Sequence, residues 1–193
     1  MLLVSSCCSS SSPTHRKLLE RVNLGSGLAP QRYANANIIY QHPESGGRLY
    51  VGNATAAKDL EILDSLDECR RIVFCQDGDG SMHHQSNPLF RYLTFPIGRW
   101  RSHVQRNPES VFNFFKPLFE FLDRELGQGN SVLIHCLAGA HRAGTAGIAS
   151  LMHLCDMDSK EATNAAQKLR PAINPIGDFP ALLALLEKGM KQR

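Results

Sequence analysis

Residues 131–147 read SVLIHCLAGAHRAGTAG and bring a thiol, a small-residue loop and an arginine close together. An apolar run ends at His135 and Cys136, and Arg142 follows the cysteine by six places. Five residues lie between them, Leu137, Ala138, Gly139, Ala140 and His141, and the middle three are small. Small side chains let a backbone curl until several N–H groups point toward one centre, and such a concavity binds anions. We expect this loop to bind a phosphate group.

The elements around the loop indicate what it does to that phosphate. A buried strand is predicted at 131–136 and a helix from about Ala143, so the loop opens at a helix N-terminus, which favours an anion. The guanidinium of Arg142 can grip two phosphate oxygens, and the same positive groups stabilise a thiolate at Cys136. A thiolate at the floor of an anion site is a nucleophile directed at phosphorus.

Strands and helices alternate along the chain from about residue 48. The predicted strands are 48–51, 71–75, 91–95 and 131–136, and the predicted helices are 54–66, 108–127, 159–169, 178–188 and the one from about 143. This alternation predicts an α/β fold with a mainly parallel central sheet flanked by helices. Ligands of such sheets bind beyond the carboxyl ends of the strands, where Cys136 lies.

The segment HCLAGAHRAG fits the HCxxGxxR signature of cysteine-dependent phosphatases. The chain from about 48 to 188 resembles the dual-specificity branch of that family, in the segments LYVGNATAAKDLEIL, YLTFPI and RPAINPIGDF. The resemblance implies the dual-specificity-phosphatase fold and a two-step reaction with Cys136 as nucleophile. It implies that Arg142 and the rest of the signature loop, residues 137–142, bind the substrate phosphate. It also implies a phosphorylated protein as partner, and neither a cofactor nor a metal.

Two positions depart from the family pattern. Ala143 stands where the family usually has a serine or threonine whose hydroxyl helps the thiolate leave, and Thr145 follows two places later. Arg99 stands where an aspartate is expected as general acid, and the acid loop, residues 97–108, contains no Asp or Glu. Three side chains are candidate substitutes for that acid: His103, Asp77 and Asp79. His135 is expected to hold the loop through hydrogen bonds to backbone.

Length and composition place the chain among ordinary globular proteins. Its 193 residues suit one domain, which we expect at 31–193 after a disordered leader at 1–30. A net charge of +3 is too small to indicate nucleic-acid binding, and no apolar stretch is long enough to span a membrane. The six cysteines are expected to be reduced and the protein cytoplasmic, although the Cys7-Cys8 pair leaves lipidation or organelle targeting open. The sequence does not indicate an oligomeric state.

Three hypotheses about function follow. The first is a dual-specificity-type phosphatase acting on phosphotyrosine and also on phosphoserine or phosphothreonine through a cysteinyl-phosphate intermediate. The second keeps the reaction and changes the substrate to a phosphoinositide, a phosphoglucan or an RNA 5′-triphosphate. The signature loop has no lysine, unlike that of the phosphoinositide branch, which weakens the lipid alternative. The third is a phosphate-binding protein of low turnover, suggested by the missing aspartate.

Overall fold

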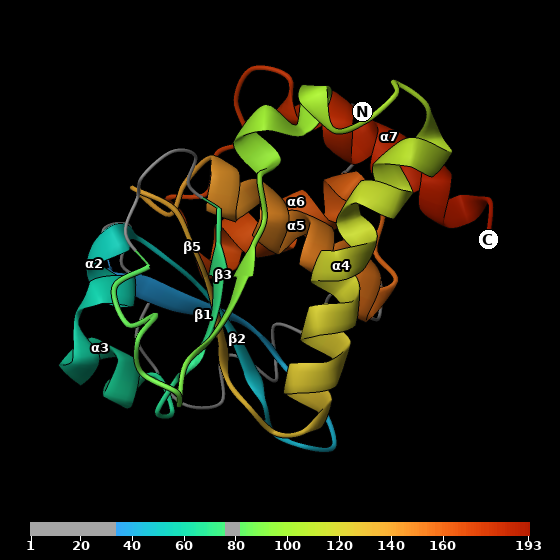
Figure 1. Ribbon diagram of the computed structural model, residues 1–193. Helices are drawn as coiled ribbons and strands as arrows, with labels where there is room; N and C mark the ends of the chain where they lie inside the picture. Colours follow the sequence, from blue (N-terminus) through green and yellow to red (C-terminus); the bar gives the residue numbers. More distant parts are fainter. Residues whose placement is uncertain (1–33, 76–81) are drawn as a thin grey trace, which may run out of the picture.

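The computed structural model describes residues 34–75 and 82–193, and its elements are arranged as Figure 1 shows. In chain order they are β1 (Ala36–Gln41), β2 (Arg48–Gly52), α2 (Ala54–Lys58), α3 (Leu60–Ser65), β3 (Arg71–Phe74), β4 (Arg91–Thr94), the 3₁₀ helix η1 (Ile97–Ser102), α4 (Pro108–Gly127), β5 (Val132–His135), α5 (Arg142–Cys155), α6 (Ser159–Leu169) and α7 (Phe179–Lys191). The predicted leader at 1–30, with Cys7 and Cys8, lies outside the described residues, as do Asp77 and Asp79.

The strands form one sheet in the order β1-β2-β5-β3-β4. Strands β2, β5, β3 and β4 run parallel, which confirms the predicted, mainly parallel sheet. Strand β1 pairs antiparallel with β2 at one edge and was not among the predicted strands. Strand β5 occupies the middle of the sheet, so its carboxyl end is enclosed by neighbours on both sides.

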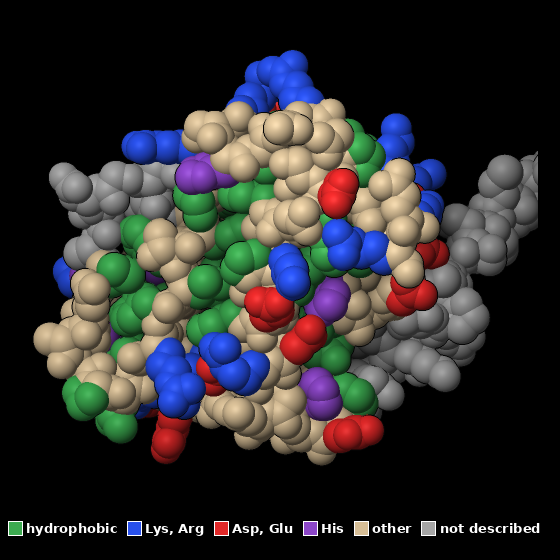
Figure 2. All heavy atoms as spheres, turned by 45° about the vertical axis from the view of Figure 1, so that its right-hand side comes forward, with side chains coloured by type: hydrophobic (Ala, Val, Ile, Leu, Met, Phe, Trp, Pro, Cys, Tyr) green, Lys and Arg blue, Asp and Glu red, His purple; other side chains and the backbone are tan. Residues whose placement is uncertain are grey.

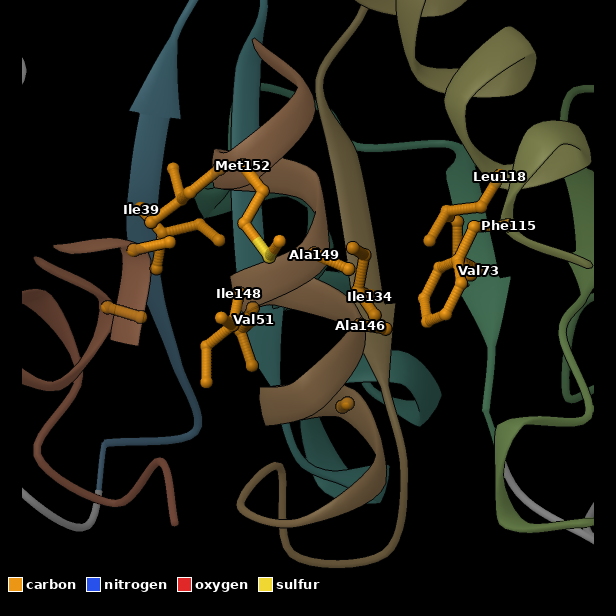
Figure 3. Close-up of a cluster of buried hydrophobic side chains, with 14 of the residues drawn as sticks. Ile39, Val51, Val73, Phe115, Leu118, Ile134, Ala146, Ile148, Ala149 and Met152 are labelled. Carbon is orange, nitrogen blue, oxygen red and sulfur yellow. The ribbon is translucent and has the colours of Figure 1, made fainter. Parts of the chain in front are cut away.

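Helices cover both faces of the sheet, and the alternation along β5 shows how. Val132 and Ile134 belong to the larger apolar core, which packs against α4, α5, α6 and α7. Leu133 belongs to a smaller core on the opposite face, under α2 and α3. Figure 3 shows Ile134 in the larger core beside Ala146 and Ala149 of α5. The small alanines let α5 lie close to the strand, which places the start of this helix directly above the end of β5.

Two helix boundaries show how local chemistry shaped the elements. A single helix was predicted over 54–66, but Asp59 has ψ 116° and divides it into α2 and α3. The Asp59 carboxylate caps α3 by accepting from the backbone N–H groups of Glu61 and Ile62 at 2.9 and 3.3 Å. The start of α4 was predicted correctly, because the Asn107 side chain accepts from Ser110 N at 2.8 Å.

The surface carries charges of both signs. Figure 2 shows Lys and Arg side chains interspersed with Asp and Glu side chains across one face of the molecule. Opposite charges pair on the surface, as between Arg48 and Asp67 at 2.8 Å and between Lys116 and Glu120 at 3.6 Å. Within 34–75 and 82–193, no helix has the length and apolarity needed to cross a membrane.

Candidate active site

Cys136 lies at the carboxyl end of the central strand β5, where the chain leaves the sheet. All four residues of β5 are buried, and only 3% of Cys136 is exposed. The signature loop then leads to Arg142, the first residue of the 14-residue helix α5. The thiol therefore lies at the floor of a loop that opens at a helix N-terminus, as the sequence predicted.

The carbonyl groups of the signature loop are bound from outside by three different parts of the fold. The N–H of Ala54, the first residue of α2, donates to the carbonyl of Leu137 at 3.1 Å. The N–H of Asn174, beyond α6, donates to the carbonyl of Ala140 at 3.2 Å. Within α5, Thr145 donates to the carbonyl of His141 from its N–H at 2.8 Å and from its hydroxyl at 2.7 Å.

The two remaining carbonyls are bound by Arg170, whose side chain is almost fully buried at 1% exposure. Its guanidinium donates to Gly139 O at 2.9 Å and to Ala138 O at 3.4 Å. It also donates to Ala34 O at 3.0 Å and to the Asn37 side chain at 2.6 Å, so it connects the loop to the start of β1. Burial lowers the pKa of Arg170, and the electrostatic interaction with Cys136 opposes that change.

These contacts determine which way the loop N–H groups point. In a planar trans peptide the carbonyl of one residue and the N–H of the next point in opposite directions. Because the carbonyls of residues 137–141 all point outward to partners, the N–H groups of residues 138–142 point inward. No N–H of residues 138–141 donates to another group within the described ranges. The loop is therefore a ring of unused donors above Cys136, suited to the oxygens of a phosphate.

Gly139 is the position in this ring that requires glycine. Its φ is +66°, a left-handed conformation that residues with a Cβ adopt at a cost. A Cβ there would also lie 2.4 Å from Gly52 O and 2.7 Å from the Arg170 guanidinium. The close approach of β2 and Arg170 to the loop thus depends on the missing side chain.

The Nδ1 atom of His135 does not make the hydrogen bond to the loop that the sequence led us to expect from this side chain. Within the described residues, its buried Nδ1 atom has no hydrogen-bond partner, so this nitrogen does not hold the loop. The ring packs instead against Phe74 of β3, with centroids 5.4 Å apart. Burial, and then the nearby His83, lower the pKa of His135 from 6.5 to about 4. The imidazole beneath the loop is therefore neutral at neutral pH.

Comparison with known proteins agrees with this geometry. The family described as "Dual specificity phosphatase, catalytic domain" matches residues 49–188. This chain belongs to the dual specificity phosphatase family. Human dual specificity protein phosphatase 9 is 28% identical over 144 residues, which cover 74% of this chain and 35% of that protein. Mouse dual specificity protein phosphatase 22 is 30% identical over 143 residues, which cover 72% of this chain and 70% of that protein.

The fold is likewise that of dual specificity phosphatases. Human DUSP28 superimposes with a TM-score of 0.62 at 19% identity, over 85% of this chain and 99% of that chain. Since the match spans the catalytic domain, the domain is a phosphatase that hydrolyses phosphoester bonds. The chain spans about a third of the length of the first of these relatives and about two thirds of the second.

The acid loop of this dual specificity phosphatase is held in place through residues of η1. Trp100 of η1 is buried, with 3% exposed, and anchors the loop in the larger core. Arg101 forms an ion pair with Asp178, the residue that precedes α7. Arg99, at a position for which the resemblance predicts an aspartate, is exposed. The loop is thus held between the core and α7 without a carboxylate of its own.

The candidate substitutes for the general acid remain predictions. His103 follows η1, is exposed and stacks on Phe114 of α4 with ring centroids 5.9 Å apart. Thr145 is fully buried, and it donates its hydroxyl proton to His141 O rather than to Cys136. The hydroxyl that the family usually supplies beside the arginine is therefore not replaced by Thr145.

Sequence reasoning missed the residues that support the loop from outside. Arg170 and Asn174 lie in the segment RPAINPIGDF, which carried part of the resemblance without a role for either. A buried arginine cannot be told from an exposed one by its neighbours in the chain, because long charged side chains are mostly exposed. Its four acceptors come from two separate segments, 34–37 and 138–139, that only the folded chain brings together.

Proposed function

We propose that this domain dephosphorylates proteins, with phosphotyrosine as the preferred phosphoester, through a cysteinyl-phosphate intermediate. The ring of inward N–H groups above Cys136 is the observation that carries the proposal. The ring can bind the three non-bridging oxygens of a phosphate, and Arg142 at the start of α5 can add a charged, bidentate contact. Phosphorus is then held above the Cys136 sulfur.

The reaction has two steps. In the first, the Cys136 thiolate attacks phosphorus, an S–P bond forms, and the bond between phosphorus and the phenolic oxygen breaks. In the second, water attacks phosphorus, the S–P bond breaks, and phosphate leaves as the thiolate is restored. Dividing one difficult displacement in two is the advantage of covalent catalysis. The fixed donors stabilise the charge on the equatorial oxygens in both steps.

The missing aspartate bears on the choice of substrate. General acid catalysis typically contributes about 10²–10⁴-fold by protonating the departing oxygen. A phenolate, with a pKa near 10, leaves far more readily without such help than the alkoxide of serine or threonine. A domain whose acid loop lacks a carboxylate should therefore favour phosphotyrosine. His103, Asp77 and Asp79 are the side chains that would reduce this preference if one of them supplies the proton.

Trapping the intermediate tests the proposal. The full chain is mixed with 4-nitrophenyl phosphate, quenched in acid and digested, and the peptide that contains Cys136 should gain the mass of one phosphoryl group. Cys136→Ser should form no such adduct and retain less than about 1% of the activity, as expected when the nucleophile is removed. Arg142→Lys should fold normally and lose most activity, because an ammonium cannot form two parallel hydrogen bonds. Substantial turnover by Cys136→Ser would refute the nucleophile assignment.

The same observation supports a second candidate, a phosphate-binding domain of low turnover. Without a carboxylate in the acid loop, the site still binds phosphate through the inward N–H groups, because binding does not require proton transfer. Titration with inorganic phosphate or vanadate, alongside turnover of a phosphotyrosyl peptide, separates the two candidates. Tight binding with no burst of product from wild type would favour the second.

A further inference from the structure

A hollow of about 650 Å³ adjoins the signature loop on its outer side. One wall consists of loop residues, and the opposite wall is the chain that follows α6; the walls include Leu137, Ala138, His141, Pro171, Ala172 and Asn174. No residue of the acid loop lines this hollow. The hollow therefore lies beside the signature loop, bounded by the loop residues Leu137, Ala138, Ala140 and His141.

The hollow continues away from the loop. A second hollow, of about 300 Å³, lies between α6 and α7 and shares Gln167 and Asn174 with the first. Lys160, at the start of α6, lines its far end. The two hollows together form a groove, which we call the α6 groove, that leads from the signature loop along α6.

The α6 groove is nearly uncharged where it meets the loop. Among the residues that the structure describes, no Asp or Glu lines either hollow. Arg170 lines the first, but its guanidinium already donates to four oxygens of the protein. The Nδ1 atom of His141 lies 2.6 Å from Asn174 O, a carbonyl that can only accept, so this nitrogen is the donor. The Arg170 guanidinium and the Nδ1 atom of His141 are therefore already committed to partners within the protein.

The remaining walls combine apolar side chains with amides. Leu137 is 64% exposed beside the loop, and Pro171 and Ala172 continue the apolar surface. Asn53 and Gln167 add side-chain amides, which can donate and accept hydrogen bonds and so suit a peptide backbone. A charged group such as a second phosphate would lose its hydration here without gaining a cation.

We propose that the α6 groove binds an uncharged stretch of peptide on one side of the phosphorylated residue, so that the preferred substrate carries a single phosphate. The inference rests on the proposed function, because the phosphate ring supplies the anchor from which the peptide extends. The occupant follows from the position of the groove beside the signature loop, from the lack of a free cation near the loop among the described lining residues, and from its amides.

The first test compares phosphotyrosyl peptides with the wild-type chain. One peptide has uncharged flanks, and two others carry a second phosphate, on a serine two residues before or two residues after the phosphotyrosine. We expect kcat/KM to be at least about tenfold lower for at least one doubly phosphorylated peptide, since a polar group left without a partner costs roughly 1–3 kcal/mol, a charged group costs more, and 1.4 kcal/mol is a factor of ten. Equal or higher kcat/KM for both doubly phosphorylated peptides would overturn the proposal.

Two substitutions test whether the α6 groove is the cause. Ala172→Trp fills the groove and should lower the ratio of kcat/KM for the uncharged peptide to that for 4-nitrophenyl phosphate by about tenfold. Its control is Ala184→Trp on the exposed side of α7. Gln167→Lys adds a cation where the two hollows meet and should raise kcat/KM for a doubly phosphorylated peptide about threefold, as a surface ion pair would. Its control, Gln128→Lys at the end of α4, makes the same charge change elsewhere.

The outcomes separate this proposal from the proposed function. If wild type turns over no substrate, the proposed function fails, and the groove is tested by the affinity of the same peptides for Cys136→Ser, measured by fluorescence anisotropy. The groove proposal is then supported if the singly phosphorylated peptide binds more tightly than the doubly phosphorylated ones, and if Ala172→Trp weakens that binding whereas the control Ala184→Trp does not. A preference for a phosphoinositide headgroup, or unchanged ratios in both groove variants, would overturn it.

Discussion

His135 lies buried directly before Cys136, and replacing it by asparagine should change how the protein responds to acid. Only 2% of His135 is exposed, and its Nδ1 atom has no partner within the described residues. Burial, and to a lesser extent His83, lower the pKa of the ring from 6.5 to about 4. The His135 ring is therefore harder to protonate in the folded protein than in the unfolded chain. His135→Asn removes that difference while keeping a planar polar side chain.

The size of the effect follows from linkage between protonation and folding. Between pH 6.5 and about 4, the unfolded chain holds a proton at this residue that the folded chain does not. The contribution of His135 to the free energy of unfolding is therefore present above pH 6.5 and is lost as the pH drops from 6.5 to about 4. A pKa difference of about 2.5, at about 1.4 kcal/mol per unit, amounts to about 3 kcal/mol. About 2 kcal/mol of this is lost between pH 7 and pH 5.

Urea unfolding at pH 7 and pH 5 measures this loss. Trp100 is the single tryptophan and is 3% exposed, so its fluorescence reports on unfolding. The drop in unfolding free energy between the two pH values should be about 2 kcal/mol smaller in His135→Asn than in wild type. His103→Asn, which removes an exposed histidine, should follow the wild-type curve. Equal drops in wild type and His135→Asn would refute the reasoning, whatever the stability of the variant at pH 7.

Three further predictions concern the phosphate ring and its chemistry. Gly139→Ala should lower kcat/KM at least about a hundredfold, because the added Cβ would displace β2 or Arg170. The control Gly127→Ala, where no atom lies within 4 Å of the added Cβ, should match wild type. Equal kcat/KM for the two variants would disprove the tight fit at Gly139. Iodoacetamide should modify Cys136 before Cys69, because burial raises the pKa of the Cys69 thiol to about 12. Phosphate should slow the modification of Cys136 and leave that of Cys69 unchanged. Equal labelling rates for the two cysteines would contradict an activated thiolate at Cys136. The last test measures the rate for a series of aryl phosphates whose phenols differ in pKa, with wild type, His103→Ala, Asp77→Asn and Asp79→Asn. If one of these residues is the general acid, its replacement should make the rate fall more steeply as the phenol pKa rises. Parallel plots for all four proteins would exclude all three residues.

The sequence alone was sufficient for the part of the site that is contiguous in the chain. The order of strand, Cys136, small-residue loop and helix lies within 131–155, and its direction follows from local preferences for strand, turn and helix. Parallel strands followed by helices also determined the mainly parallel sheet, which the order β2-β5-β3-β4 confirms. Asn107 and Pro108 marked the start of α4 correctly, because capping is a local interaction.

Tertiary structure alone decided the features that depend on distant partners. Strand β1 has a short apolar run that gains strand geometry through its pairing with β2 at the sheet edge. Arg170 becomes a support of the signature loop because folding brings 34–37 and 138–139 to one buried guanidinium. Within the described part of the chain, the buried Nδ1 atom of His135 has no partner, and its ring packs against Phe74 of the neighbouring strand β3. Residue types and spacing specify local backbone paths and candidate chemistry, but burial and hydrogen-bond partners are properties of the assembled chain.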